Sequence, residues 1–167
     1  MQIQLSSIAS AELIFKMLGD CKKALEDEHI FQWTDSYPNI TIIKEDIIQK
    51  SVYELRRDEE FLGTVTLNTK QEPQYQSIDW NDGNGEPLVI HRLAINPGCQ
   101  GKGYAKTLMR FAEQFAYEKR FSSVRLDAYS GNKVALQLYE RLGYMNKGLV
   151  WFPGRSLPFF CFEKVLP

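Results

Sequence analysis

The chain has 167 residues, of which 44% are hydrophobic and 25% are charged. This composition is typical of a globular protein and excludes a disordered or fibrous chain, and the length suits one domain, which we expect to span residues 1–167. The formal net charge of −1 gives the chain no general attraction to nucleic acid or to anionic membranes, so we expect neither as a partner.

The first half of the sequence alternates strand patterns with helix patterns. Apolar residues recur at helical spacing after Ser10, which is a candidate N-cap, and two strand-like runs flank the charged turn 58–60. The predicted elements are a strand at 1–5, a helix at 11–28, a loop at 33–39, a helix at 41–49 and a hairpin of strands at 52–57 and 61–67.

The second half begins with a polar segment, residues 68–87, that is rich in Gln, Asn, Asp, Gly and Pro. Loops of this length are often functional, and we expect this one to close over a small-molecule site. The elements predicted after it are a strand at 88–95, a turn at 96–101, a helix at 102–119, a strand at 123–128, a helix at 133–142 and strands at 147–152 and 159–166. Together they predict an α/β fold with a mixed sheet and helices on both faces.

Location and metal content also follow from composition. No stretch approaches the roughly 20 apolar residues that span a bilayer, and no basic segment precedes an apolar run at the N-terminus, so we expect a cytoplasmic protein. Cys21, Cys99 and Cys161 are odd in number and widely spaced, which fits neither a disulfide framework nor a metal-binding pair. With only two histidines in addition, we expect no metal site.

A glycine-bearing segment between a predicted strand and a predicted helix is the first candidate binding site. Gly101 and Gly103 allow the backbone to approach a ligand closely. The first turn of the following helix carries unpaired N–H groups and the positive end of the helix dipole, which together favour an anion. Lys102 and Lys106 add positive charge nearby. The same glycines also fit a plain strand-to-helix turn, so the segment by itself leaves both interpretations open.

Two other phosphate motifs fit this segment poorly. A P-loop requires Ser or Thr after its Gly-Lys pair, whereas Gly103 follows Lys102 here. A Rossmann fingerprint would place Lys106 where a third Gly or Ala permits close packing of helix on strand. Asp127, at the end of the next predicted strand, keeps a dinucleotide-dependent oxidoreductase as an alternative.

Three segments of the second half carry family motifs. Residues 91–97 are HRLAINP, a strand with its exit turn, and residues 100–105 are QGKGYA, which contains Gln, two residues, Gly, one residue and Ala. Residues 132–144 are NKVALQLYERLGY, a helix with Asn at its start, Leu-Tyr in its middle and Gly-aromatic at its end. In this order and at these separations, the segments resemble the GNAT superfamily of acyl-CoA-dependent N-acetyltransferases.

The resemblance implies a GNAT-like fold, in which a mostly antiparallel central sheet is splayed at its middle strands and acetyl-CoA lies in the resulting V. It implies acetyl-CoA as co-substrate and an amine as acceptor. Leu93 and Ile95 would offer backbone groups to the pantetheine arm and the acetyl group, and Asn132 would hydrogen-bond the coenzyme. The pyrophosphate loop would comprise Gln100, Gly101, Lys102, Gly103, Tyr104 and Ala105.

Tyr139 is the candidate proton donor to the leaving CoA thiolate. A phenol with a pKa of about 10 stays protonated at neutral pH and can protonate a thiolate. The position also fits a core aromatic residue on an amphipathic helix. Asn132 before it and Gly143 after it complete the family motif and favour the catalytic role.

His91 is the first candidate for the base that takes up the proton of the amine, directly or through water. An unperturbed histidine is mostly neutral at pH 7, and some members of the family place a base on this strand. A structural histidine bonded to a backbone group fits the position equally well. Because no acid lies within residues 88–95, Glu86, Asp79 and Asp82 in the preceding loop are further candidates.

The acceptor itself is not identified by any motif. The length of the 68–87 loop favours a small molecule, and a protein or peptide N-acetyltransferase is the alternative. A non-catalytic acyl-CoA-binding or sensory domain is a second alternative, although Tyr139 and His91 favour catalysis. The family includes homodimers, but no sequence signature decides the oligomeric state. Aromatic residues that are candidates to line an acceptor pocket are Trp33, Tyr37, Trp80, Trp151 and Phe152.

Overall fold

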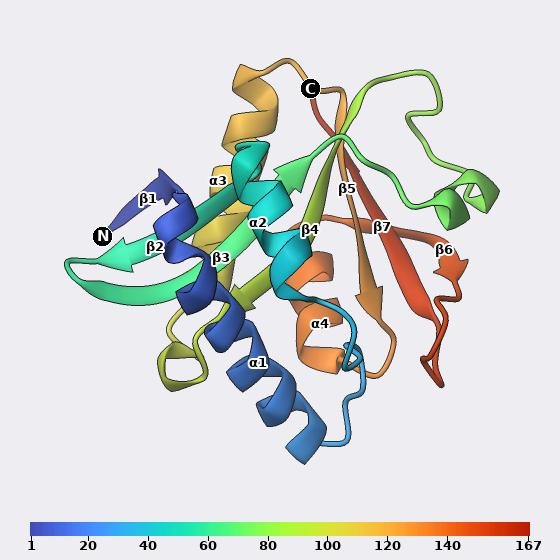
Figure 1. The fold of residues 1–167 in the computed structure, drawn as a ribbon. Helices are drawn as coiled ribbons and strands as arrows, with labels where there is room; N and C mark the ends of the chain where they lie inside the picture. Colours follow the sequence, from blue (N-terminus) through green and yellow to red (C-terminus); the bar gives the residue numbers. More distant parts are fainter. The chain divides into compact units, whose positions relative to one another are not determined.

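The computed structural model describes the whole chain, residues 1–167, with strands and helices in the order predicted from the sequence (Figure 1). Contacts within the chain define two compact units, which are described separately. The first consists of Met1–Leu67 and Arg92–Arg110, and the second consists of Asn68–His91 and Phe111–Pro167.

Four α-helices and seven strands make up the fold. The elements in chain order are β1 (Gln2–Leu5), η1 (Ile8–Ser10), α1 (Ala11–Asp27), α2 (Ile40–Ile48), β2 (Val52–Arg57), β3 (Glu60–Asn68), η2 (Pro73–Ser77), β4 (Pro87–Ile95), η3 (Pro97–Cys99), α3 (Tyr104–Glu118), β5 (Ser123–Tyr129), α4 (Lys133–Arg141), β6 (Met145–Val150) and β7 (Phe159–Val165). The strands form one sheet in the order β1-β2-β3-β4-β5-β7-β6. Strands β4 and β5 pair in parallel, whereas β1–β2, β2–β3, β5–β7 and β6–β7 pair antiparallel. The predicted α/β class with a mixed, mostly antiparallel sheet is confirmed.

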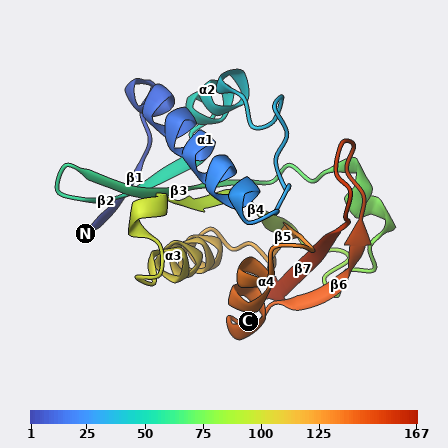
Figure 2. The same ribbon diagram turned by 90° about the horizontal axis from the view of Figure 1, so that it is seen from below.

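The core of the first unit forms where α1 and α2 meet the strands β1–β3. The two helices lie side by side on one side of these strands (Figure 2). Their buried residues include Ile14, Met17 and Leu18 of α1 and Ile43 and Ile47 of α2, each no more than 5% exposed. Removing this apolar surface from water is the main stabilising contribution to the unit.

Helix α1 begins after Ser10, as predicted, but the Ser10 side chain does not cap it. Its hydroxyl donates instead to Oε1 of Glu54 at 3.4 Å. Glu54 is 2% exposed and also accepts hydrogen bonds from Gln4 and Arg56, each at 3.2 Å. A buried carboxylate is costly unless donors surround it, and Ser10 supplies one of them. The prediction of Ser10 as a side-chain cap is therefore wrong.

The start of α3 also differs from the prediction. The helix begins at Tyr104 rather than at residue 102. Gly101 and Gly103 have φ angles of +75° and +82°, in the left-handed region, which a right-handed helix cannot include. Strand β6 is likewise displaced from the predicted 147–152, because its pairing with β7 begins two residues earlier, at Met145.

Strands β4 and β5 are paired only near their starts. The pairing runs from Pro87 opposite Ser123 to Val89 opposite Arg125, and both strands continue beyond these positions. Further along β4, Arg92 has a φ of +46°, which interrupts the extended backbone as a β-bulge does. The middle of the sheet is therefore irregular at the strand that the family motif marks as central.

A buried ion pair joins β5 to β7 in the second unit. Arg125 Nε lies 3.1 Å from Glu163 Oε1, and the two side chains are 5% and 0% exposed. Arg125 also donates to the side-chain oxygen of Gln71 at 2.8 Å and to the carbonyl of Asp82 at 2.6 Å. Its guanidinium carbon lies 4.3 Å from the ring centroid of Trp80. These contacts compensate the cost of removing two charges from water.

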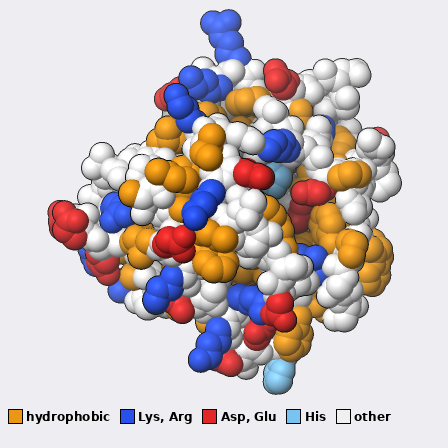
Figure 3. Space-filling model, viewed as in Figure 1, with side chains coloured by type: hydrophobic (Ala, Val, Ile, Leu, Met, Phe, Trp, Pro, Cys, Tyr) orange, Lys and Arg blue, Asp and Glu red, His pale blue; other side chains and the backbone are white.

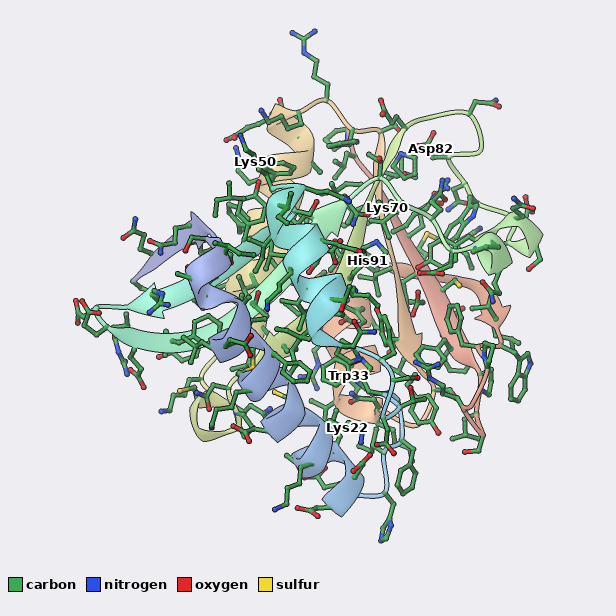
Figure 4. The ribbon with its side chains drawn as sticks, viewed as in Figure 1. Lys22, Trp33, Lys50, Lys70, Asp82 and His91 are labelled. Carbon is green, nitrogen blue, oxygen red and sulfur yellow. The ribbon has the colours of Figure 1, made fainter.

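The same pair holds the long segment 68–87 in place. Glu163 accepts hydrogen bonds from the backbone N–H groups of Asn81 at 2.7 Å and Asp82 at 3.4 Å, while Arg125 binds the segment from the neighbouring strand. Figure 4 labels Asp82 within this segment. The segment is therefore tied to the strands beneath it by buried side chains, which argues against the lid that its length suggested.

Glu163→Ala should lower the free energy of unfolding by about 3–5 kcal/mol, because it leaves the Arg125 guanidinium buried without its counter-charge. Urea unfolding measures the change. Asp20→Ala is the control, because it removes one partner of the exposed Lys16–Asp20 pair at 3.1 Å and should cost no more than about 0.5 kcal/mol. Equal losses in the two variants would contradict the anchoring role of the buried pair.

Candidate active site

The glycine segment after β4 forms an open loop that leads into α3. Residues 100–103 are all exposed. The side chain of Gln100 turns back and donates to the carbonyl of Ile95 at 3.1 Å, and the side-chain oxygen of Asn96 accepts from the N–H of Gly98 at 3.2 Å. These bonds define the backbone of the turn without covering its outer surface.

The start of α3 presents free backbone donors at this loop. Its first regular bond runs from the N–H of Thr107 to the carbonyl of Gly103 at 3.1 Å. The N–H groups of Tyr104 and Ala105 precede this bond, so they have no partner within the helix and lie at the positive end of its dipole. A Cβ atom built on Gly101 or Gly103 would meet no atom within 4 Å. The loop therefore combines oriented donors with open space, which suits an anionic ligand.

Leu93 and Ile95 precede this loop on β4. Leu93 is partly exposed, and Ile95 is 8% exposed. The carbonyl of Ile95 accepts from Gln100 and also from the thiol of Cys21 at 3.2 Å. Because that carbonyl is engaged within the protein, a predicted contact from the Ile95 backbone to a pantetheine arm would not use it.

Asn132 caps helix α4 in the second unit. Its side-chain oxygen accepts from the N–H of Ala135 at 3.1 Å, the usual geometry of an N-cap. The predicted hydrogen bond to a coenzyme would therefore come from the amide nitrogen of Asn132, which carries two donors.

Tyr139 lies on the buried side of α4 and is 7% exposed. Its ring centroid lies 6.2 Å from that of Tyr144 and 5.8 Å from that of Phe162. Burial raises the pKa of its hydroxyl above the ordinary value, and the Asp127 carboxylate raises that pKa further. Tyr139 thus combines core packing with a hydroxyl that stays protonated at neutral pH, as a proton donor must.

His91 is partly exposed on β4. A histidine is visible in Figure 3 at the place where Figure 4 labels His91. Its Nε2 lies 2.9 Å from the side-chain oxygen of Asn68 and 3.2 Å from the carbonyl of Lys70. The structure therefore contains the backbone contact of a structural histidine, while the partial exposure keeps the predicted role as a base open.

Asp127 is a further candidate for the base. The sequence motifs associated it only with a dinucleotide-dependent oxidoreductase. It shares one face of the sheet with His91, because Val89 pairs with Arg125 and each residue follows two positions later. Tyr75 donates to Oδ2 of Asp127 at 2.6 Å. Burial raises the pKa of Asp127 to about 6, a value that suits a general base at neutral pH. In the sequence, the alternation of side chains along β5 was the only signal that could have identified Asp127 as a site residue.

The acids predicted in the loop before β4 are less suited to that role. Asp79 and Glu86 are exposed. The Ser122 hydroxyl beside Asp82 lowers the pKa of that carboxyl, which weakens it as a base. Asp127 is therefore the acid that burial and geometry favour.

Most of the aromatic residues predicted to line an acceptor pocket have packing roles. Trp33 packs against the core of the first unit, and Phe152 lies edge-on to Phe159 with centroids 5.0 Å apart. Trp80 covers the guanidinium of the buried ion pair. Trp151 is 56% exposed and remains available to a ligand.

The structure shows neither a metal-binding cluster nor a membrane-spanning helix. No group of three or more His, Cys, Asp or Glu side chains is arranged to hold a metal ion. None of the helices combines the length and the apolar character needed to cross a bilayer.

Comparison with known sequences decides the family. The profile of the acetyltransferase (GNAT) family matches residues 18–144. The chain belongs to this family. It is also 26% identical over 136 residues to the uncharacterized N-acetyltransferase YesJ of Bacillus subtilis, a match that covers 80% of this chain and 76% of that protein.

Solved structures agree on the fold. A GNAT-family acetyltransferase from Streptococcus agalactiae superposes with a TM-score of 0.85 at 22% identity, over 99% of this chain and 95% of that one. The PaiA N-acetyltransferase of Thermoplasma acidophilum, solved in complex with coenzyme A, gives a TM-score of 0.74 at 18% identity, over 99% and 98% of the two chains. The predicted GNAT fold is confirmed, and with it the class of acetyl-CoA-dependent N-acetyltransferases.

The raised pKa of Asp127 predicts how stability depends on pH. The folded-state pKa of about 6 exceeds the unfolded value of about 3.9, so the folded protein loses stability as pH rises between these values. Asp127→Asn removes this loss. The free energy of unfolding of the variant, relative to that of the parent, should therefore increase by on the order of 2 kcal/mol as the pH rises from 4 to 7.5. Urea unfolding at both pH values measures the gain, and the exposed Asp79→Asn is the control. Parallel pH dependence of parent and Asp127→Asn would contradict the raised pKa.

Proposed function

We propose that this enzyme transfers the acetyl group of acetyl-CoA to an amine of a small-molecule acceptor by direct attack in a ternary complex. The observation that carries the proposal is the open glycine loop at the start of α3, in a chain of the GNAT family. A compact acceptor is favoured because the candidate bases His91 and Asp127 are partly buried.

The coenzyme pyrophosphate is assigned to the loop residues 100–105. Its negative charge suits the free N–H groups of the first turn of α3 and the helix dipole. Lys102 and Lys106, both exposed, add positive charge at the same end of the helix. Leu93 contributes backbone to the pantetheine arm, and Asn132 donates from its amide nitrogen.

The reaction requires a neutral amine. At pH 7, deprotonating an amine with a pKa of about 10.4 costs about 4.6 kcal/mol, whereas an α-amine near 7.8 costs only about 1 kcal/mol. The amine nitrogen attacks the thioester carbon, and the carbonyl oxygen gains negative charge that a backbone N–H can stabilise. A proton acceptor therefore matters most for strongly basic amines.

Tyr139 donates the proton that the leaving thiolate takes up as the carbon–sulfur bond breaks. Burial raises the pKa of this hydroxyl, which makes it a weaker acid. A thiolate that forms in an apolar setting is also a stronger base than one in water, so donor and acceptor remain matched. Proton transfer then accompanies cleavage and does not precede it.

His91 and Asp127 are the two candidates for the base that receives the proton of the amine. They occupy the same face of neighbouring strands. His91 lies next to fixed hydrogen-bond acceptors, whereas Asp127 is a carboxylate with a pKa of about 6. Glu86 and Asp79 are the next candidates for the base if neither the replacement of His91 nor that of Asp127 lowers activity.

Gly103→Val should abolish the rise in Tm that acetyl-CoA causes, because the side chain projects into the space assigned to the phosphate. Gly143→Val is the matched control: Gly103 and Gly143 have φ angles of +82° and +85°, and neither has an atom within 4 Å of a built Cβ. Both variants should lose on the order of 1–2 kcal/mol through backbone strain.

Only Gly143→Val should keep the stabilisation by acetyl-CoA, which is about 2.7 kcal/mol when the ligand concentration is 100 times Kd. Thermal unfolding with and without millimolar acetyl-CoA makes the comparison. A normal shift in Gly103→Val would remove the phosphate site from the proposal.

Tyr139→Phe should lower kcat by roughly 10²–10⁴, the usual contribution of general acid catalysis, and should leave acetyl-CoA binding intact. The ring and its packing stay, so stability should change by less than about 1 kcal/mol. Thiol release with a panel of amines measures kcat. Full activity in the variant would make Tyr139 a core residue only.

The same panel tests the alternatives for the function. A parent protein that binds acetyl-CoA without releasing thiol for any amine would favour the non-catalytic acyl-CoA-binding domain. Release only with peptide amines would favour a protein or peptide N-acetyltransferase.

A further inference from the structure

Two fixed acceptors face the same nitrogen of His91. Nε2 lies 2.9 Å from Oδ1 of Asn68 and 3.2 Å from the carbonyl of Lys70. A backbone carbonyl can only accept. Oδ1 of Asn68 also accepts the backbone N–H of Lys70 at 2.9 Å, which establishes that the amide oxygen, and not the nitrogen, faces this side. Nε2 of His91 therefore carries a proton.

We propose that the Asn68 side chain and the Lys70 carbonyl are positioning groups that hold His91 as its Nε2–H tautomer, so that Nδ1 receives the proton of the amine. This inference rests on the proposed acetyl transfer with His91 as the base. As the amine nitrogen bonds to the acetyl carbon, its N–H bond breaks and the proton passes to the lone pair on Nδ1. The resulting imidazolium keeps its Nε2–H bonded to the same two oxygens.

The arrangement suits a base because the acceptors are in place before the proton arrives. Two oxygens on the Nε2 side stabilise the positive charge that the ring gains, and no group has to reorient during the reaction. Figure 4 shows Lys70 and His91 next to each other. Gln71, the residue after Lys70, is bonded to the buried Arg125 at 2.8 Å, so the position of the Lys70 carbonyl is tied to the core of the unit.

Charged residues lie next to His91 along its own strand and on neighbouring elements. Lys70 follows β3, and Arg92 follows His91 on β4 but forms a buried ion pair with Asp46. On β5, Asp127 shares the face of His91. A carboxylate introduced at position 68 would add a negative charge directly at the Nε2–H side of the ring.

The tautomer is tested first, by ¹⁵N NMR of the imidazole. The chain has only two histidines, His29 and His91, so His29→Gln leaves one ring to observe. At high pH, where the ring is neutral, Nε2 should show a protonated nitrogen and Nδ1 a lone-pair nitrogen, with the Nε2 proton protected from exchange. Asn68→Leu should lose that protection. An Nδ1–H ring in the parent protein overturns the inference.

Kinetics test the positioning role. Asn68→Leu should lower kcat by roughly 10- to 100-fold, with KM for the amine within about twofold, because the base is misoriented while binding is retained. Asn68→Asp keeps both accepted bonds, so it should restore kcat and move the rising limb of kcat/KM to higher pH, since its charge favours the imidazolium. Ser77→Ala removes an exposed bond to Gln74 in the same segment and should change neither quantity.

His91→Gln separates failure of the inference from failure of the base assignment. Glutamine offers an amide N–H to Asn68 but no basic nitrogen. If His91→Gln is inactive while Asn68→Leu keeps the kcat and pH profile of the parent, the positioning role is overturned and the base assignment stands. If His91→Gln is fully active, the base assignment fails and the inference fails with it, while thiol release by the parent still reports acetyl transfer.

Discussion

The buried pair of Arg125 and Glu163 is the interaction on which the second unit depends. Two charges removed from water are tolerated only when hydrogen bonds satisfy the rest of their donors and acceptors. Here those partners come largely from the segment 68–87, which supplies the side chain of Gln71 and backbone groups of Asn81 and others. The electrostatic requirement of two strand residues therefore dictates the path of a segment without regular strand structure.

That path places the partners of both candidate bases. The start of the segment brings Asn68 against His91, and its short helix η2 brings the Tyr75 hydroxyl against Asp127. Asn68 lies outside β4, the strand of His91, and Tyr75 lies outside β5, the strand of Asp127. A change in the buried pair would thus disturb the proposed chemistry indirectly, through the orientation of two side chains on the same face of the sheet.

The loop of the first unit follows a different physical rule. The phosphate site proposed for it requires exposed donors, so burial cannot hold the loop in place. Gly101 and Gly103 adopt left-handed φ angles, and the side chain of Gln100 closes the turn from within. This conformation explains why the helix start was predicted two residues too early: the glycines keep the backbone out of the helical region, and it turns helical only at Tyr104. Periodicity reports side-chain direction and contains no information on φ.

The sequence by itself determined the order of the strands and α-helices and the GNAT family, because periodicity, glycines and the motif around Tyr139 are local signals. Only the tertiary structure decided which partners the polar side chains have. Ser10 serves the buried Glu54 and does not cap its helix, and Asp127 owes its raised pKa to burial. Burial and hydrogen-bond partners arise from residues far apart in the chain, and the free energy of a buried charge depends on those neighbours, which no local pattern encodes.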